Sequence, residues 1–145
     1  MSAHDPACAF CAIVSGDADA LVVLQDARTM AFLDRRPLFP GHVLLVPREH
    51  IATLTDAPPE LMAPLFGQAR RLAAAVERAM DAQGSFVAIN NTVSQSVPHL
   101  HVHIVPRSRG DGLKGFFWPR HGYRDGEHAE RVRSAIREAL EATEG

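Results

Sequence analysis

The spacing of apolar residues along the chain predicts a sheet built from short strands. Apolar runs bounded by turn residues favour five strands, at residues 21–24, 29–33, 42–46, 85–89 and 100–105. The first two runs are close enough to form a hairpin, and Pro40-Gly41 is a turn signal before the third. Pro47 and Pro106 are expected to end the third and fifth strands, because proline cannot donate a ladder hydrogen bond.

Two further segments have the spacing of amphipathic helices. After a proline-containing start at residues 56–60, apolar residues recur every three or four positions at Leu61, Leu65, Ala69, Leu72, Val76 and Met80. Pro64 predicts a kink or a late start, and Gly84 is the expected end. Residues 127–142 form the second predicted helix, rich in Glu/Arg pairs at helical spacing. The order of elements predicts an α+β fold with a mainly antiparallel five-stranded sheet and two helices.

Composition narrows the class of protein without naming a function. A chain of 145 residues suits one domain, expected to span 1–145 with its core at about 8–118. Its formal net charge of −2 gives no overall field for nucleic acid, and no basic, aromatic-rich patch for it is present. No apolar run approaches the roughly 20 residues that cross a bilayer, and no leader-like N-terminus is seen. We therefore expect no membrane segment and a cytoplasmic protein.

The most informative segment is an alternating histidine run at residues 99–105. Side chains alternate between the faces of a strand, so His99, His101 and His103 are expected on one face, spaced by roughly 6.5–7 Å. Leu100 and the other apolar residues would then pack on the opposite face. Packing explains three imidazoles in alternation poorly, because an apolar residue would fill the space without the cost of desolvating a polar ring. The run therefore indicates binding or catalysis.

This run resembles the signature of the histidine triad (HIT) superfamily. The match is His-x-His-x-His with apolar intervening residues, preceded by Gln95-Ser96-Val97-Pro98. Further similarity covers residues 31–34, residues 40–47 and Asn90, in the same order as in the family. Ser94 departs from it, since many relatives carry glycine there, and a backbone with positive φ would strain serine.

The resemblance implies a hydrolase that acts on a purine nucleotide at its α-phosphate. His101 would attack the phosphorus and form a covalent nucleotidyl-histidine, with its far ring nitrogen held by the backbone carbonyl of His99. Water would then release a nucleoside monophosphate. His103 and His42 would bind the phosphate oxygens, and Ser96 would protonate the leaving group.

The resemblance also implies a set of nucleotide-binding residues. These are Phe10 and Phe32 around the base, Asp34 on the ribose, and Asn90 and Gln95 as further hydrogen-bond donors. Two of them have plainer explanations, since Phe32 also suits an ordinary core and Asp34 a turn at a strand end.

Cys8 and Cys11 are the only cysteines, and their Cys-x-x-Cys spacing indicates a metal or redox site in a reducing compartment. Resemblance to zinc-bearing members of the superfamily adds His50 and His99, which completes a structural zinc site. Two ordinary buried thiols with a surface His50 are the alternative. A redox motif is disfavoured because no βαβ pattern surrounds it.

The leaving group is left open by the sequence. A phosphoramidate or adenylate and a dinucleoside polyphosphate use the same His101 chemistry, and the basic residues between 107 and 124 either receive outer phosphates or form a solvated loop. Nucleotidyl transferases of the superfamily are much longer chains. The alternative function is a zinc-stabilised nucleotide-binding or partner-binding module with little turnover. The resemblance also implies a homodimer.

Overall fold

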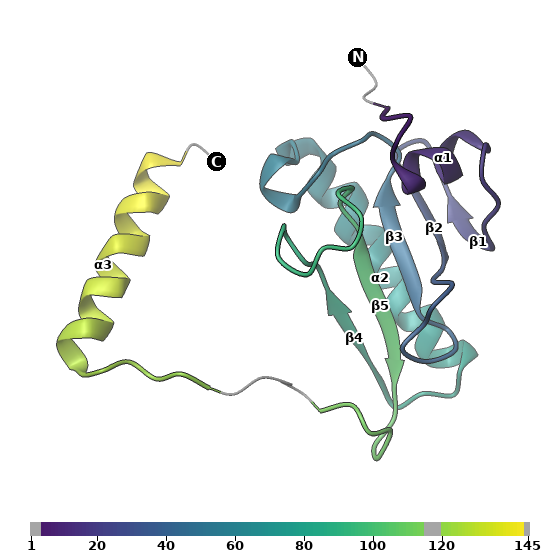
Figure 1. The fold of residues 1–145 in the computed structure, drawn as a ribbon. Helices are drawn as coiled ribbons and strands as arrows, with labels where there is room; N and C mark the ends of the chain where they lie inside the picture. The colour runs from purple at the N-terminus through teal and green to yellow at the C-terminus, as the bar shows by residue number, and fades with distance from the viewer. Residues whose placement is uncertain (1–3, 115–119, 144–145) are drawn as a thin grey trace. The chain divides into compact units, whose positions relative to one another are not determined.

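A computed structural model describes residues 4–114 and 120–143 of the chain. These residues fall into two units that divide after Asp111. The first unit carries the sheet (Figure 1), and the second carries the helix α3 (Gly126–Ala142). Residue 118, the expected end of the core, lies outside the described residues, and a single domain over 1–145 stays a prediction. Among the described residues, no helix has the length and apolar character needed to cross a bilayer.

The first unit is built on a five-stranded sheet in the order β1-β2-β3-β5-β4. Every neighbouring pair is antiparallel, which confirms the predicted fold class. The strands are β1 (Val22–Gln25), β2 (Thr29–Leu33), β3 (Val43–Pro47), β4 (Gly84–Ala88) and β5 (Val102–Arg107). The predicted bounds of β2 are exact, and those of the other four strands differ by one or two residues.

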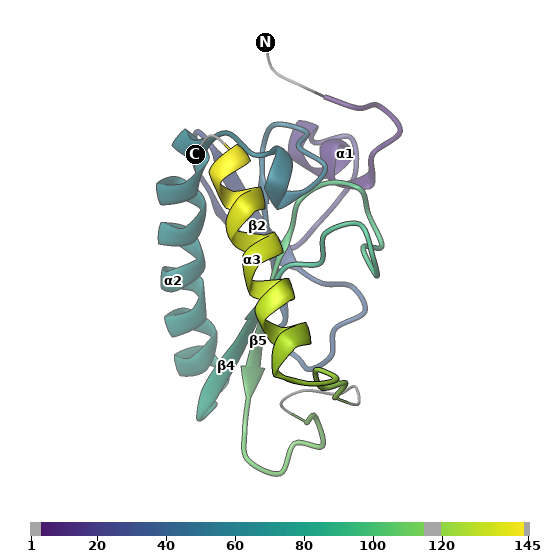
Figure 2. The same cartoon turned by 90° about the vertical axis from the view of Figure 1, so that its left-hand side faces the viewer.

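The helix α2 (Met62–Ala79) covers one face of this sheet, as Figure 2 shows. It follows the short 3-10 turns η1 (Leu54–Asp56) and η2 (Pro59–Leu61), so the late start predicted from Pro64 is confirmed. Pro64 lies in the first turn, where a backbone N–H has no intrahelical partner to lose. The predicted apolar face is buried against the sheet and the residue that precedes β5 by two positions, at Ala31, Val43, Leu45, Leu100, Val102 and Ile104.

The end of α2 corrects two predictions. The helix stops at Ala79, not Gly84, because the backbone of Asp81 turns left-handed with φ 49°. The N–H of Ala82 then donates to the carbonyl of Glu77 at 2.8 Å, which satisfies the last turn. Met80, expected on the buried face, is 43% exposed because it lies past the helix end.

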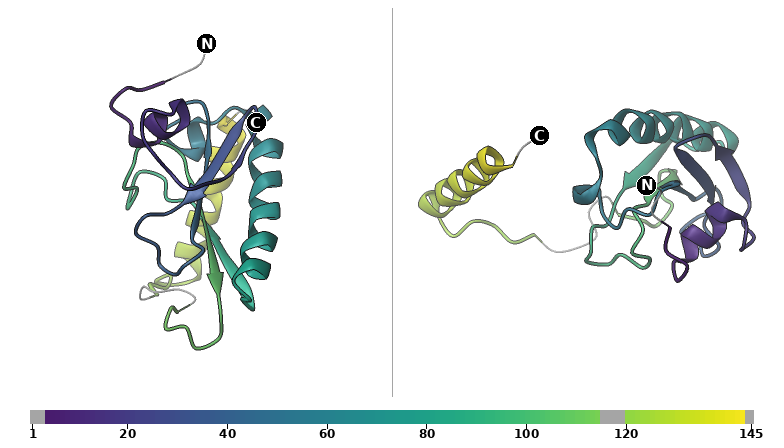
Figure 3. Two further views of the ribbon diagram at one scale, coloured as in Figure 1. Left: turned by 90° about the vertical axis from the view of Figure 1, so that its right-hand side faces the viewer. Right: turned by 90° about the horizontal axis from the view of Figure 1, so that it is seen from above.

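The opposite face of the sheet carries α1 (Ala9–Ser15), a short helix that the sequence patterns did not predict. Figure 3 shows α1 and α2 on different sides of the strands. Gly16, with φ 88°, closes α1 in the left-handed conformation that glycine adopts without strain. Apolar residues of α1 pack with Met30, Phe32, Leu44 and Val46 into a second, smaller core.

The strand β5 begins later and ends later than predicted. Its first residue is Val102, so His99 and His101 precede the strand. Leu100, Val102 and Ile104 are fully buried toward α2, as the alternation predicted. Pro106 does not end the strand, which pairs on to Gly84 through Arg107. β3 pairs with β5 only as far as Ile104, so Pro106 lies beyond that ladder.

The second unit holds α3, whose predicted bounds of 127–142 are correct to one residue. Asp125 caps its start, since its carboxylate accepts the N–H of His128 at 2.7 Å.

Candidate functional site

The start of α1 brings the two cysteines to the histidine run. Cys8 is the N-cap of the helix, and its Sγ accepts the N–H of Cys11 at 3.4 Å. One helical turn therefore directs both sulfurs to the same side. His99 and Cys11 are fully buried there, and His50 is half-buried.

The four side chains converge as the ligands of a tetrahedral metal would. Cys8 Sγ lies 3.4 Å from His99 Nδ1, and Cys11 Sγ lies 3.4 Å from His50 Nδ1 and 3.6 Å from His99 Nδ1. Zinc bonds of about 2.3 Å to sulfur and 2.0–2.1 Å to nitrogen place such ligand pairs roughly 3.5 Å apart. The residues present therefore fit a Cys2His2 zinc site, the set that the resemblance implied.

The backbone fixes which nitrogen of His99 faces the sulfurs with a lone pair. Its Nε2–H donates to the carbonyl of Pro47 at 2.8 Å, which leaves Nδ1 unprotonated. Burial lowers the pKa of His99 to about 4, and burial raises the pKa of the Cys11 thiol. The imidazole is thus neutral, as a metal ligand must be.

The adjacent backbone fixes the orientation and the tautomer of His101. It is 2% exposed, and its Nδ1–H donates to the carbonyl of His99 at 2.7 Å. Its Nε2 therefore carries the lone pair. The ring of Phe10 meets that of His101 edge-on, with centroids 5.1 Å apart and planes at 85°, which limits rotation of the imidazole.

His42 and His103 form a chain of hydrogen bonds that starts at the backbone. The N–H of Leu38 donates to His42 Nδ1 at 3.1 Å, so the proton of His42 is on Nε2. His42 Nε2–H donates to His103 Nδ1 at 3.0 Å, which leaves the remaining proton of His103 on Nε2. Burial, with the nearby His101 and His42, lowers the pKa of His103 to about 4. Burial also lowers the pKa of His42, against the attraction of Asp34.

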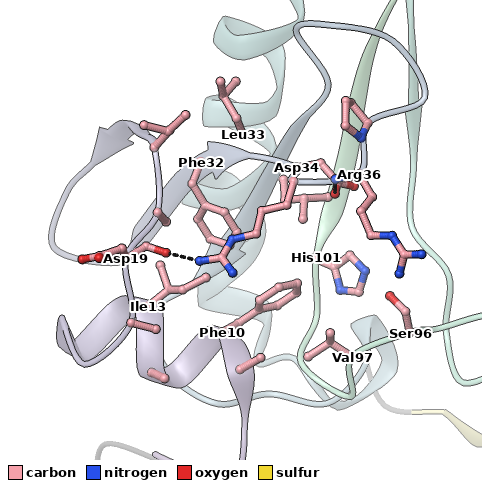
Figure 4. Close-up of a pocket in the computed structure, with 18 of the residues that line it drawn as sticks. Phe10, Ile13, Asp19, Phe32, Leu33, Asp34, Arg36, Ser96, Val97 and His101 are labelled. Carbon is pink, nitrogen blue, oxygen red and sulfur yellow. Dashed lines mark hydrogen bonds between the residues drawn. The ribbon is translucent and has the colours of Figure 1, made fainter.

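A cavity of about 790 Å³ opens beside these imidazoles. Figure 4 shows His101 facing it, with Phe10, Phe32 and Ile13 forming its apolar side. Phe10 and Phe32 also contact each other edge-on at 5.4 Å. Asp34 lines the cavity and at the same time accepts the N–H of Arg36 at 2.9 Å, so the two interpretations of this residue are compatible.

The predicted site residues divide into those that line the cavity and those that support it. Ser96 and His103 line it, whereas His42, Asn90 and Gln95 do not. Gln95 donates to the carbonyl of Ala52 at 2.7 Å and accepts the N–H of Thr92 at 2.8 Å. Asn90 donates to the carbonyl of Ser94 at 3.3 Å. Direct contacts from these three residues to a nucleotide stay predictions.

The loop before the histidine run has the positive φ that was expected to strain Ser94. Ser94 has φ 62° and Thr92 has φ 68°. Neither residue is glycine, so the loop holds two side chains in the left-handed region at some cost in strain.

Sequence patterns missed the charged residues Asp19 and Arg35 of the cavity, and also Arg36. Arg36 lies in the turn after β2, two residues beyond Asp34, and lines the cavity together with His101. An arginine in a polar turn is ordinarily solvated, so no pattern singled it out. Its position just after β2, which carries Phe32, and two residues beyond Asp34 was the only available signal.

Comparison with known proteins agrees with this geometry. The HIT domain family model matches residues 15–110. An uncharacterised HIT-like protein of Mycobacterium tuberculosis, Rv1262c, is 39% identical over 108 residues, 73% of this chain and 75% of that one.

Two relatives in Schizosaccharomyces pombe are named as enzymes. The adenosine 5′-monophosphoramidase hnt1 is 32% identical over 114 residues, 77% of this chain and 83% of that one. The asymmetrical bis(5′-nucleosyl)-tetraphosphatase is 37% identical over 83 residues, which are 56% of this chain and 46% of that enzyme.

Solved structures extend the likeness over nearly the whole chain. SMU.412c of Streptococcus mutans superposes with a TM-score of 0.86 at 31% identity, covering 97% of this chain and 89% of that one. A zinc-bound histidine triad family protein of Mycobacterium smegmatis gives a TM-score of 0.71 at 37% identity, covering 94% and 98%. From the histidine run, the cavity beside it and the family match, the chain belongs to the HIT family.

Proposed function

We propose that this chain is a nucleotide hydrolase that cleaves at the α-phosphate through a nucleotidyl-His101 intermediate. The observation that carries the proposal is the hydrogen bond from His101 Nδ1–H to the carbonyl of His99 at 2.7 Å, at the edge of the cavity. It leaves the Nε2 lone pair as the nucleophile. The two relatives named as enzymes both act on nucleotide phosphorus bonds, which supports the reaction class.

The cavity offers a place for each part of a purine nucleotide. Phe10, Phe32 and Ile13 supply an apolar surface for the base, and Asp34 an acceptor for ribose hydroxyls. The α-phosphate would lie between His101 and His103. His103 Nε2–H then donates to a phosphate oxygen and stabilises the charge that develops there.

The reaction has two steps. In the first, a bond forms between His101 Nε2 and phosphorus while the bond to the leaving group breaks, and the leaving group takes its electron pair. An amine leaving group also takes a proton, for which the candidate donor is the hydroxyl of Ser96, which lines the cavity. In the second, water attacks phosphorus, the phosphorus–nitrogen bond breaks, and a nucleoside monophosphate leaves with one proton released. Where Ser96 has protonated an amine, this proton restores its hydroxyl.

We further propose that Cys8, Cys11, His50 and His99 hold one zinc ion. Four protein ligands leave no open position, so the metal would supply structure alone. These ligands join α1 to the segment before β5. His99 is therefore both a ligand and, through its carbonyl, the support of His101.

The test combines turnover with detection of the intermediate. Wild type and His101→Gly are compared on adenosine 5′-phosphoramidate and diadenosine tetraphosphate, with His121→Gly, an exposed residue of the second unit, as control. We expect kcat/KM to fall by roughly a thousandfold or more in His101→Gly alone. Quenching in base, where a phosphorus–nitrogen bond survives, should give wild type a mass increase of one nucleotidyl group on His101.

Two outcomes would overturn the proposal. Equal turnover by His101→Gly would exclude the covalent route. Nucleotide binding without turnover by wild type would favour a zinc-stabilised binding module. The homodimer and the cytoplasmic location stay predictions, and sedimentation at micromolar concentration tests the first.

A further inference from the structure

Arg36 places a permanent positive charge at the cavity on the side where His101 lies. It belongs to the turn after β2, and the carboxylate of Asp34 fixes that turn by accepting the Arg36 N–H at 2.9 Å. Figure 4 shows its side chain reaching toward Ser96 and His101, away from the apolar side of Phe10 and Ile13. Arginine does not lose its proton in proteins, so this charge is present at every working pH.

The guanidinium of Arg36 differs from those of its neighbours in having its donors available. Over residues 4–114 and 120–143, no hydrogen bond or ion pair of this guanidinium is found. The neighbouring Arg35 donates to the carbonyl of Asp19 at 2.6 Å. Arg107, in the basic segment that was left open as a receiver of outer phosphates or a solvated loop, is engaged by Asp111 at 2.6 Å.

The layout of the cavity indicates which part of a bound substrate would lie near the guanidinium of Arg36. A base against Phe10 and Phe32 and an α-phosphate at His101 leave the groups beyond phosphorus on the side of Ser96 and Arg36. We propose that Arg36 selects substrates whose leaving group is a tetrahedral oxyanion, a phosphate or sulfate joined to the α-phosphate. This inference rests on the proposed function and names its substrate class.

Charge distinguishes the two classes of leaving group. When the bond from phosphorus to a bridging oxygen breaks, that oxygen keeps the electron pair and the departing phosphate or sulfate gains negative charge. Arginine can donate two parallel hydrogen bonds to such a group. A departing amine needs a proton instead, which a guanidinium does not supply. Arg36 therefore stabilises the first class during bond breaking and leaves the second unaffected.

The experiment measures kcat/KM for three substrates that share one nucleotide. These are diadenosine tetraphosphate, adenosine 5′-phosphosulfate and adenosine 5′-phosphoramidate, tested on wild type, Arg36→Gln and Arg36→Lys. We expect Arg36→Gln to lose roughly 10- to 100-fold on one or both oxyanion substrates and less than about threefold on the phosphoramidate. Arg36→Lys should recover part of the loss, since it keeps the charge without the paired donors.

A matched control is Arg78→Gln, which removes one exposed arginine from α2, on the other face of the sheet. It should leave all three values unchanged. The two oxyanion substrates separate phosphate from sulfate: the one with the larger loss identifies the group that Arg36 receives. An equal loss on all three substrates would overturn the proposal in favour of a contact to the α-phosphate. No loss on any of them would overturn it in favour of a solvated arginine.

A binding measurement keeps this test independent of turnover. In a His101→Gly background, Arg36→Gln should weaken binding of diadenosine tetraphosphate roughly tenfold or more and leave binding of adenosine monophosphate within about twofold. If the wild type shows no turnover, that result would uphold the role of Arg36 while the hydrolase proposal is rejected. Equal affinities with and without Arg36 would reject its role, whatever the wild type hydrolyses.

Discussion

Two clusters of polar side chains, each with two histidines, lie on the same side of the sheet and differ in the ligand that they suit. One consists of Cys8, Cys11, His50 and His99, and the other of Asp34, His42 and His103. In each cluster the atoms that could bind a metal lie within 4.8 Å of one another. Proximity alone therefore does not separate a metal site from a phosphate site.

The difference comes from the backbone group behind each imidazole. At His99 the backbone partner is a carbonyl. The carbonyl of Pro47 accepts a hydrogen bond from Nε2–H, so the unprotonated Nδ1 faces the sulfurs. At His42 the backbone partner is an amide. The N–H of Leu38 donates to Nδ1, so the ring proton is on Nε2 and faces His103. An imidazole that donates to a backbone carbonyl is thus suited to bind a metal, and one that accepts from a backbone amide is suited to donate a hydrogen bond.

The largest effect is expected from breaking the first cluster with Cys11→Ser. A serine hydroxyl is a poor ligand for zinc, so metal content should fall from about one ion per chain to none. Because a zinc ion held by these four ligands would join α1 to the segment before β5, the free energy of unfolding should fall by roughly 4 kcal/mol or more. Elemental analysis and denaturant unfolding measure both changes.

The control for this change is His42→Phe in the second cluster, which should keep its zinc. Wild-type protein purified without chelator and free of zinc would contradict the metal assignment. So would a Cys11→Ser protein as stable as wild type.

Breaking the second cluster should instead affect rate. His42→Phe keeps a ring in the 3% exposed position of His42 and removes the donor that fixes His103. His103 is then free to turn its unprotonated nitrogen to the phosphate. We expect kcat/KM to fall roughly 100-fold, the usual cost of one misplaced donor.

His42→Gln distinguishes positioning from packing, because its amide can still donate to His103 Nδ1. It should recover a measurable part of the lost rate, with zinc content equal to wild type. Equal activity of Phe and Gln variants would show that His42 only fills space.

Periodic patterns predicted the parts of this molecule that pack. The spacing of Leu65, Ala69, Leu72 and Val76 gave the buried face of α2, and alternation placed Leu100, Val102 and Ile104 beneath it. α1 escaped prediction because its seven residues are too few to show a period, and its N-cap is a cysteine. The one sequence feature that indicated this helix was Gly16 at its end.

The chemistry of the site depended on contacts that no spacing encodes. Cys8 and His99 are 91 residues apart, and resemblance to a family, not pattern, brought them together. The carbonyl of Pro47 and the N–H of Leu38 belong to the backbone, so no choice of side chain reveals their direction. Residue types therefore indicated which groups form the candidate site, and the fold determined which ring nitrogen of each histidine faces its partner.

The smallest predicted effect is the contribution of His103 to the pH dependence of the free energy of unfolding. Its pKa in the folded chain is lowered to about 4 by burial and by His101 and His42, against the attraction of Asp34. In the unfolded chain a histidine has a pKa of about 6.5. Between these values the unfolded state binds the extra proton, so stability falls as pH falls from about 6.5 toward 4. One such group contributes a slope of roughly 1 kcal/mol per pH unit.

The slope is isolated by comparing unfolding of wild type and His103→Gln at several pH values in this window. Acid also protonates the zinc ligands, but both proteins share them, so the difference between their curves belongs to His103 and the imidazoles coupled to it. We expect a shallower curve for His103→Gln, and an unchanged one for His121→Gln, which replaces an exposed histidine of the second unit. Parallel curves for wild type and His103→Gln would mean that His103 takes up its proton as readily in the folded chain as in the unfolded one. The second cluster would then differ from the first, where burial lowers the pKa of His99 to about 4, in proton uptake as well as in hydrogen-bond direction.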